Sequence, residues 1–385
     1  MSRASSGHII FTIDNPPPFA GGGAGKLALK LARRLREKGC SIEIITPNPH
    51  SWHVIEKEVN GVPVVFLPCG IRHPEFLFSI IYNFQMALWL IRRRHRLTAI
   101  HLRGMRGVLL LILFSKWTGI RLFVTALSES NWRLLNPFPP SNPYRWLVRT
   151  LLKDIHGFVA LSHRLADVMT QEGIRSDLIV YIPNGASVPD RPSDRITLRS
   201  RLRLPQMEFI ALYAGRLHWQ KDIFFLLNGW KNYIQERTPS RLLLLGDGPQ
   251  LNEIKCYIDK NNLTDRIFCL GYRDDVAEYL AAADVFILPS RIEGCSNALL
   301  EAMAYGLACV ATDSPGNDEV IENGKSGFLV EFENLEQFQS VLTRLHDEPE
   351  TRETMGQAAR QRVHDSFSLE QNAQRHITLY FPDSI

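Results

Sequence analysis

Short apolar runs alternate with longer amphipathic stretches along the chain. Residues 8–13 and 41–46 have the length and composition of buried strands, and the stretch between them carries apolar residues at helical spacing up to Lys38. The same alternation restarts at residues 209–213. Strands that alternate with helices are typical of parallel sheets covered by helices, so the pattern predicts an α/β fold.

The other predicted strands share a short, strongly apolar run bounded by turn residues. They are residues 62–67, 99–106, 122–126, 158–161, 241–245, 267–270, 283–289 and 307–312. Further helices are predicted at residues 76–90, after Lys221, after Ser296 and from about residue 366.

The length of the chain indicates more than one domain. A chain of 385 residues exceeds one ordinary hydrophobic core. Pro189 and Pro192 flank a polar segment between the two alternating patterns. We therefore predict two doubly wound, Rossmann-like domains at residues 1–190 and 191–365, followed by a helical segment at residues 366–385.

The composition is that of a soluble globular protein, with 45% apolar and 22% charged residues. The apolar runs at residues 76–91 and 108–114 are too short or too polar to span a bilayer, and the N-terminus shows no signal peptide. Six cysteines form no C-x-x-C pair, which favours reduced thiols over disulfides or zinc. We therefore expect a cytoplasmic protein.

The charge is unevenly distributed. Residues 1–190 contain 23 Lys and Arg against 12 Asp and Glu, whereas residues 191–385 contain 21 against 28. The predicted helix at residues 76–90 runs into four arginines, Arg92, Arg93, Arg94 and Arg96. An apolar helix with a cationic end fits a peripheral contact with an anionic membrane. A core helix with a solvated basic end explains the same residues, and no nucleic-acid-binding motif supports a third alternative.

One stretch, residues 290–316, combines two carboxylates with a predicted helix start. Glu293 precedes the helix, which Ser296 or Asn297 can cap, and Glu301 lies about one turn after Asn297. A helix N-terminus binds anions, and carboxylates bind hydroxyl groups. A nucleotide-sugar, with its pyrophosphate and hydroxyl-rich ends, is such a ligand.

The run E-G-x-x-N-x-x-x-E-A-M-A-x-G in this stretch resembles the Glu-x7-Glu signature of glycosyltransferase family 4. Upstream, Gly215-Arg-Leu217 with Lys221 is similar to the phosphate clamp of that family, and Pro183-Asn-Gly185 to its interdomain motif. The resemblance implies a GT-B fold, in which two Rossmann-like domains face a cleft. It also implies that residues 366–385 cross back to the first domain.

The resemblance implies a role for each motif residue. Glu293 would bind hydroxyls of the transferred sugar and Glu301 those of the ribose, while Arg216 and Lys221 would neutralise the leaving diphosphate. Glu293, Arg216 and Lys221 form the expected catalytic set. The expected donor-binding residues are Gly215, Arg216, Lys221, Tyr272, Arg273, Glu293, Gly294, Cys295, Ser296, Asn297, Ala298 and Glu301. We expect Lys221 and Glu301 to be largely exposed without ligand.

The acceptor-side residues come from the first half of the chain. They are Gly21, Gly22, Gly23, His101, Arg103 and Glu129. His101 can alternatively be a hydrogen-bonded core histidine. Many family members carry a histidine that contacts the donor sugar just after the Val-Thr pair at residues 124–125, where this chain has Ala126 and Leu127. Ser128 or Glu129 can take its place.

No metal or other cofactor is expected, because no Asp-x-Asp motif stands at a strand end. A P-loop is excluded by Ala20 and Leu27 at two of its required positions, and no acidic residue supports a dinucleotide site. The resemblance thus predicts a retaining glycosyltransferase of polysaccharide, lipopolysaccharide or glycolipid biosynthesis, with a glycan or lipid-linked acceptor. A catalytically weakened nucleotide-sugar-binding subunit, or a GT-B epimerase or phosphorylase, remains an alternative. The nucleotide, sugar, acceptor, linkage and oligomeric state stay open.

Overall fold

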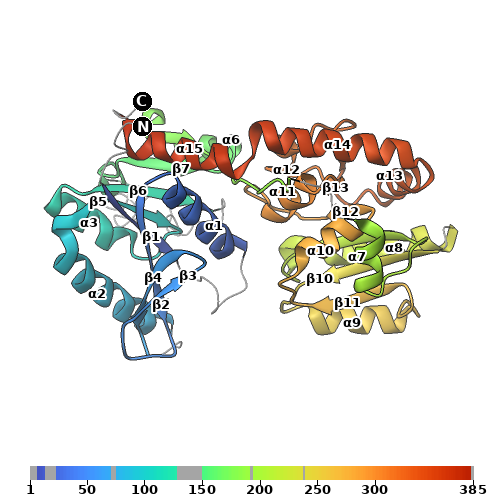
Figure 1. The fold of residues 1–385 in the computed structure, drawn as a ribbon, viewed down its shortest axis with the longest axis horizontal. Helices are drawn as coiled ribbons and strands as arrows, with labels where there is room; N and C mark the ends of the chain where they lie inside the picture. The colour runs from blue at the N-terminus through green and yellow to red at the C-terminus, as the bar shows by residue number, and fades with distance from the viewer. Residues whose placement is uncertain are drawn as a thin grey trace. The chain divides into compact units, whose positions relative to one another are not determined.

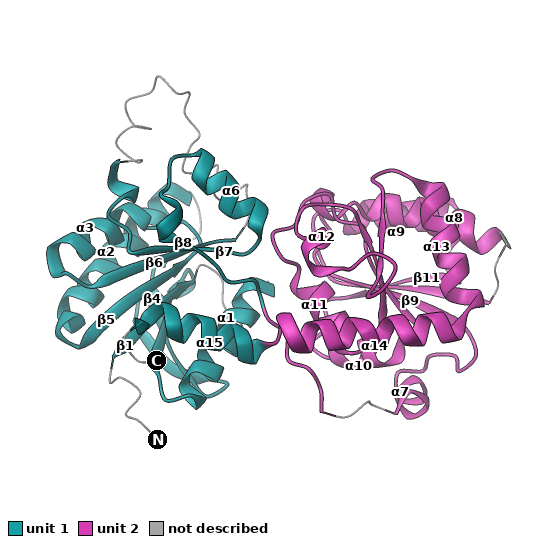
Figure 2. Cartoon of the chain, turned by 90° about the horizontal axis from the view of Figure 1, so that it is seen from above, with its two compact units in different colours: residues 1–184, 369–385 teal, residues 185–368 magenta. Residues whose placement is uncertain are grey.

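A computed structural model describes residues 7–13, 23–70, 75–127, 150–190, 194–236 and 239–382. The chain divides into two compact units (Figure 2). Unit 1 comprises residues 1–184 and 369–385, and unit 2 comprises residues 185–368. The first division falls within the Pro183–Gly185 motif rather than at residue 190.

Unit 1 is built on an eight-stranded sheet with the order β3-β4-β2-β1-β5-β6-β7-β8. All neighbouring pairs are parallel except β3 and β4. The strands are β1 (His8–Ile13), β2 (Ser41–Asn48), β3 (Ile55–Val59), β4 (Val62–Pro68), β5 (Leu97–Arg103), β6 (Arg121–Ala126), β7 (Gly157–Ala160) and β8 (Ile179–Tyr181).

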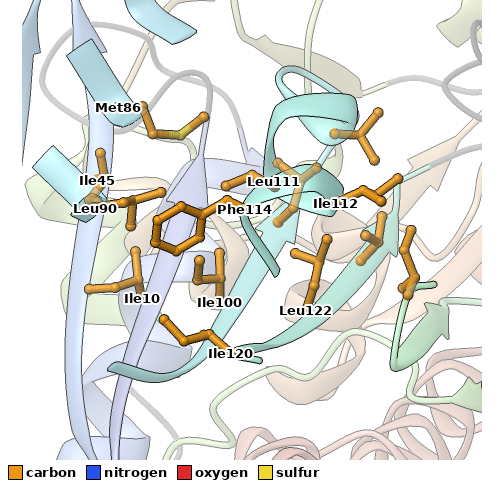
Figure 3. Packing of buried hydrophobic residues seen from close by; sticks show 14 of the residues in the cluster. Ile10, Ile45, Met86, Leu90, Ile100, Leu111, Ile112, Phe114, Ile120 and Leu122 are labelled. Carbon is orange, nitrogen blue, oxygen red and sulfur yellow. The ribbon is translucent and has the colours of Figure 1, made fainter. Parts of the chain in front are cut away.

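Helices cover both faces of this sheet (Figure 1). On one face, α2 (Glu75–Arg93) and α3 (Val108–Thr118) share a core cluster with Ile10, Ile100 and Leu122 (Figure 3), and α6 (His163–Gln171) packs on β7 and β8. On the other face, α1 (Gly23–Glu37) and α15 (Leu369–Tyr380) pack on alternate residues of the same strands. This alternation follows from the two-residue period of a strand, whose successive side chains point to opposite faces.

The terminal helix α15 belongs to unit 1 although it follows unit 2 in the sequence. Tyr380 is fully buried against Phe11 and Phe123. Arg34 and Lys38 of the α1 region form ion pairs with Glu370 at the start of α15. The chain therefore leaves unit 1 near residue 184 and returns near residue 369 to complete its core.

Unit 2 contains a six-stranded sheet with the order β11-β10-β9-β12-β13-β14, and its paired strands are parallel. Its strands are β9 (Phe209–Ala214), β10 (Ser240–Leu245), β11 (Ile267–Gly271), β12 (Val285–Leu288), β13 (Ala308–Thr312) and β14 (Phe328–Val330). Its helices are α7 (Arg195–Arg201), α8 (Ile223–Glu236), α9 (Leu251–Lys260), α10 (Val276–Ala282), α11 (Asn297–Ala304), α12 (Asn317–Val320), α13 (Leu335–Asp347) and α14 (Pro349–Ser366).

Three strands, β3, β8 and β14, were not predicted. The edge strand β3 is mostly exposed, and β8 and β14 each have only three residues. The run at residues 108–114, which had no assigned structure, forms most of α3. All six cysteines are free, and no helix among the described residues is both long and apolar enough to cross a membrane.

One buried carboxylate ties the amino-terminal edge of the unit 2 sheet to two helices. Asp284, directly before β12, accepts from the guanidinium of Arg199 on α7 at 2.7 Å and from the backbone N–H of Ile210 at 2.7 Å. Arg195 pairs with the same carboxylate, and Arg352 on α14 lies 3.6 Å from it. Because Arg199 is only 3% exposed, removal of Asp284 would leave a buried guanidinium without its carboxylate.

We predict that Asp284→Ala lowers the free energy of unfolding of unit 2 by about 3–5 kcal/mol, the usual cost of breaking a buried ion pair from one side. The matched control is Asp265→Ala, because the Asp265 side chain is 71% exposed beside Arg266, and that change should cost less than about 1 kcal/mol. Urea unfolding followed by hydrogen–deuterium exchange of unit 2 peptides measures both. Equal losses in the two variants would contradict the assignment.

Candidate functional site

The residues of the predicted donor site lie in loops at one edge of the unit 2 sheet and in the first turns of α11 (Asn297–Ala304). Arg216 and Lys221 follow β9, Tyr272 follows β11, and Glu293 follows β12. These strands belong to one parallel sheet, so the loops after them emerge at its carboxyl edge. This edge is where open α/β sheets bind ligands.

Lys221 and Glu293 form an ion pair through Nζ and Oε1. Their side chains are only 23% and 9% exposed. The expectation that Lys221 is largely exposed without ligand is therefore wrong. Its ammonium group can be partly buried because it is paired with the carboxylate of Glu293. The pair joins the two sequence motifs directly, although they are 72 residues apart.

Tyr213, on β9, is a buried neighbour that the sequence did not single out. Its hydroxyl donates a hydrogen bond to the backbone carbonyl of Arg216 at 2.9 Å and so fixes the loop that begins at Gly215. Burial, and next the charge of Glu293, raise the pKa of this hydroxyl well above its ordinary value. Tyr213 is therefore a neutral hydrogen-bond donor that supports the loop, while the Arg216 side chain is exposed.

The loop after β12 leads into the capped helix α11. Ser296 is the cap, and its hydroxyl accepts from the backbone N–H of Leu299 at 3.4 Å. Asn297 and Ala298 then open the helix, where backbone N–H groups have no partner within the helix. The side-chain oxygen of Asn297 is buried and has no hydrogen-bond partner within the described part of the chain. The backbone N–H groups at the helix start are thus donors for an anion, and the Asn297 oxygen is an acceptor beside them.

Two glycines allow the site loops to touch backbone to backbone. Gly246, after β10, has φ +146°, and a Cβ added there would lie 1.8 Å from the carbonyl oxygen of Gly215. Gly316, after β13, has φ +92°, and its added Cβ would lie 2.6 Å from the carbonyl oxygen of Gly294. The neighbouring loops therefore support the Gly215 and Gly294 segments directly.

Glu301 lies one turn into α11 and is partly buried, so the expectation that it is largely exposed is also wrong. Its carboxylate is close enough to Tyr305 to help raise the pKa of that phenol, for which burial is the larger cause. Cys295 is buried beside the cap. Both residues remain in the candidate site, and Glu301 is less exposed than the sequence indicated.

The loop after β11 holds Tyr272 and Arg273. Tyr272 is 49% exposed and donates a hydrogen bond to Asp274 at 2.9 Å. Arg273 pairs with both carboxylate oxygens of Asp275 at 2.8 and 2.6 Å, which holds the pKa of Asp275 below its ordinary value. The exposed ring of Tyr272 provides a flat surface at the same edge.

Two further polar groups near Lys221 have no distinctive sequence signal. The pKa of His218 is lowered first by burial and then by the charges of Arg216 and Lys221. Asp222 accepts from Arg291 Nε at 2.8 Å, and the backbone N–H of Arg291 donates to the carbonyl of Gln220 at 2.9 Å. These contacts join the Lys221 loop to the Glu293 loop.

Of the predicted acceptor-side residues, the structure describes Gly23, His101 and Arg103, and two of these three are buried. His101 is fully buried, with Nδ1 bonded to the hydroxyl of Tyr380 and Nε2 at 2.6 Å from Thr125 Oγ1. Burial lowers its pKa well below the ordinary value, so the ring is neutral. His101 is therefore the core histidine of the alternative interpretation. Arg103 is 5% exposed at the carboxyl end of β5.

Of the remaining acceptor-side residues, Gly23 is the first residue of α1. Gly21, Gly22, Ser128 and Glu129 lie outside the described residues. Leu127 directly follows β6 and is partly exposed, at the position where the resembling family carries its histidine. Within the described ranges, no group of three or more His, Cys, Asp or Glu side chains could hold a metal ion.

Two family descriptions match most of the chain. Residues 194–362 match the family described as glycosyl transferases group 1, and residues 22–185 match the glycosyl transferase 4-like domain. Sucrose-phosphate synthase from Thermosynechococcus elongatus has a TM-score of 0.82 at 20% identity, covering 98% of each chain. This likeness confirms the predicted GT-B fold.

Two curated relatives are similar in sequence. UDP-Gal:alpha-D-GlcNAc-diphosphoundecaprenol alpha-1,3-galactosyltransferase of Escherichia coli is 29% identical over 244 residues, which are 62% of this chain and 63% of that enzyme. N-acetyl-alpha-D-glucosaminyl L-malate synthase of Bacillus anthracis is 24% identical over 367 residues, 94% of each chain. The likeness to the first relative thus spans less than two thirds of its length.

We predict that Gly246→Ala destabilises unit 2 more than Gly271→Ala does, by about 1–3 kcal/mol. Both glycines have positive φ, so both changes carry a backbone cost, but an added Cβ meets nothing within 4 Å at Gly271. The difference combines the contact with Gly215 and the larger backbone cost at Gly246, whose φ of +146° lies farther from the left-handed region than the +70° of Gly271. Thermal and urea unfolding measure it, and equal losses would show that the loops separate without cost.

Proposed function

Because the chain belongs to the glycosyl transferase group 1 family, we propose that it moves a sugar from a nucleoside diphosphate to a glycan or lipid-linked acceptor, with retention at the anomeric carbon. The observation that carries the site assignment is the Lys221–Glu293 ion pair beside the start of α11. It joins a cation suited to phosphate with a carboxylate suited to sugar hydroxyls.

In the proposed complex the diphosphate lies between the loop after β9 and the start of α11. Lys221 keeps one contact with Glu293 and has two further N–H donors, and the exposed Arg216 adds a bidentate fork. The first backbone N–H groups of α11 supply the third set of donors. These groups stabilise the negative charge that develops on the diphosphate as the glycosidic bond breaks.

Glu293 has the proposed role of orienting the sugar. Its contact with Lys221 fixes one carboxylate oxygen, so the other oxygen can accept from sugar hydroxyls. Glu301, on α11, would accept hydrogen bonds from the ribose hydroxyls, and the exposed ring of Tyr272 would face the base. The remaining donor-binding residues, Gly215, Arg273, Gly294, Cys295, Ser296, Asn297 and Ala298, form the surrounding loops.

The nature of the donor and acceptor is proposed from the relatives. The name of the E. coli relative contains a UDP-sugar donor and a diphosphoundecaprenol acceptor. A uridine nucleotide and a lipid-linked acceptor are therefore the first pair to test. An acceptor in a membrane also fits the proposal that the protein works at the cytoplasmic membrane face, through a peripheral contact.

We predict that Lys221→Ala and Glu301→Ala each lower turnover about tenfold to a hundredfold, because each removes a charge-assisted hydrogen bond worth about 1.5–3 kcal/mol. Release of nucleoside diphosphate from a panel of nucleotide-sugars measures the rate. Donor-induced thermal stabilisation measures binding separately.

The matched controls are Lys255→Ala and Glu253→Ala on the exposed side of α9, which should leave turnover unchanged. Turnover near wild type in Lys221→Ala or Glu301→Ala would remove these residues from the site. Donor binding without turnover in the wild-type protein would instead favour the nucleotide-sugar-binding subunit.

We also predict that transfer continues after exhaustive chelation of divalent metal ions. Arg216, Lys221 and the α11 N-terminus provide positive charge for the departing diphosphate, so protein groups replace the usual metal. The same turnover assay, run with and without a chelator, measures this. Complete loss of activity that only magnesium or manganese restores would contradict the proposed role of the two cations.

A further inference from the structure

Helix α2 presents large apolar side chains on two opposite faces. Its buried face packs into the unit 1 core through Tyr82, Met86, Trp89 and Leu90. Its outer face carries Phe76, Ile80, Phe84 and Ile91, which are 67%, 59%, 61% and 37% exposed. The first three are spaced by four residues, so they form one stripe along the helix. A helix face that contacts only water is usually polar, so this apolar stripe indicates a contact with another surface.

The neighbouring helix α3 continues this apolar face. Leu113 and Trp117, also spaced by four, are 57% and 63% exposed. The two helices contact each other on the same face of the sheet (Figure 1). At the end of the stripe, the guanidinium of Arg94 lies 5.6 Å from the centre of the Trp117 ring. We call the four α2 residues and these two α3 residues the α2–α3 face.

Cations border this face in excess of carboxylates. Arg93 pairs with Glu56, Lys116 with Asp154, and Arg106 with Glu75. No carboxylate partner is recorded among the described residues for the three other arginines at the end of α2, which are Arg92, Arg94 and Arg96. The border of the α2–α3 face thus carries a net positive charge.

We propose that the α2–α3 face docks on the surface of a membrane that contains anionic lipids. Exposed aromatic and aliphatic side chains suit the boundary between lipid headgroups and acyl chains, and the arginines suit the lipid phosphates. The positive border of the face is complementary to anionic lipids. It disfavours a second copy of this chain as the partner, because two such basic borders would repel each other. The contact is peripheral and reversible.

The direction of α2 indicates how a membrane at this face would bring a lipid-linked acceptor to the protein, an inference that rests on the proposed function. Strand β4 runs toward the carboxyl edge of the unit 1 sheet, and α2 returns from that edge to the start of β5. A membrane along α2 therefore passes the carboxyl edge of the sheet. A lipid-linked acceptor held in the leaflet would reach that edge without leaving the membrane.

Co-sedimentation of the full chain with vesicles tests the proposal without donor, acceptor or turnover, so its failure is distinct from failure of the proposed function. The wild-type protein should sediment with vesicles of phosphatidylcholine and phosphatidylglycerol at low salt. It should sediment much less with phosphatidylcholine alone or at high salt, because salt screens the charges.

The double variant Ile80→Gln/Phe84→Gln should bind these vesicles at least about tenfold more weakly. Its control is Ile196→Gln/Met207→Gln, which changes two residues of unit 2 that are 70% and 93% exposed. Because all four side chains are exposed, melting temperatures should stay near that of the wild type. A loss of binding in the stripe variant alone supports the proposal.

The charge variant Arg92→Gln/Arg96→Gln should also weaken binding at least about tenfold. Lys255→Gln/Lys260→Gln, on the exposed side of α9, removes the same charge elsewhere and should have little effect. The proposal is overturned if the wild-type protein ignores anionic vesicles at low salt, or if each control binds as weakly as its partner variant. It is also overturned if, without lipid, the wild-type protein self-associates and the stripe variant does not, because a second copy would then cover the face.

Discussion

The strands of unit 2 run in one direction, and the candidate site depends on this constraint. Each strand must be followed by a crossover, so the loops that begin at Gly215 and Glu293 leave the sheet at the same edge. Local sequence then decides only which side chains occupy those loops. The ion pair of Lys221 and Glu293 is the direct result.

Holding this ion pair in place has a cost and a benefit for the free energy of the site. Moving both charges out of water is unfavourable, and their mutual attraction offsets it only while the geometry is held. The geometry is held by Tyr213 beneath one loop, by the Asp222–Arg291 pair between the loops, and by glycine contacts at the backbone. The site therefore has its polar groups oriented in advance, which reduces the reorganisation needed when a charged ligand binds.

The sequence predicted most of the strands and the Ser296 cap of α11, because apolar runs and helix caps are local signals. It could not predict that Lys221 and Glu293 shield each other, since their contact is made across 72 residues. His101 was ambiguous for the same reason: its partner Tyr380 comes from the far end of the chain. The strand Ile55–Val59 was missed because its exposed side chains carry no hydrophobic pattern.

The discontinuity of unit 1 has a consequence during protein synthesis. Residues 185–368 are contiguous and can fold as soon as they leave the ribosome, but unit 1 lacks α15 until residues 369–380 are translated. Until then the cluster around Phe11 and Phe123 lacks Tyr380, and His101 lacks one of its two hydrogen-bond partners. Unit 1 thus begins before unit 2 and is completed after it, so its core lacks α15 while unit 2 is being made.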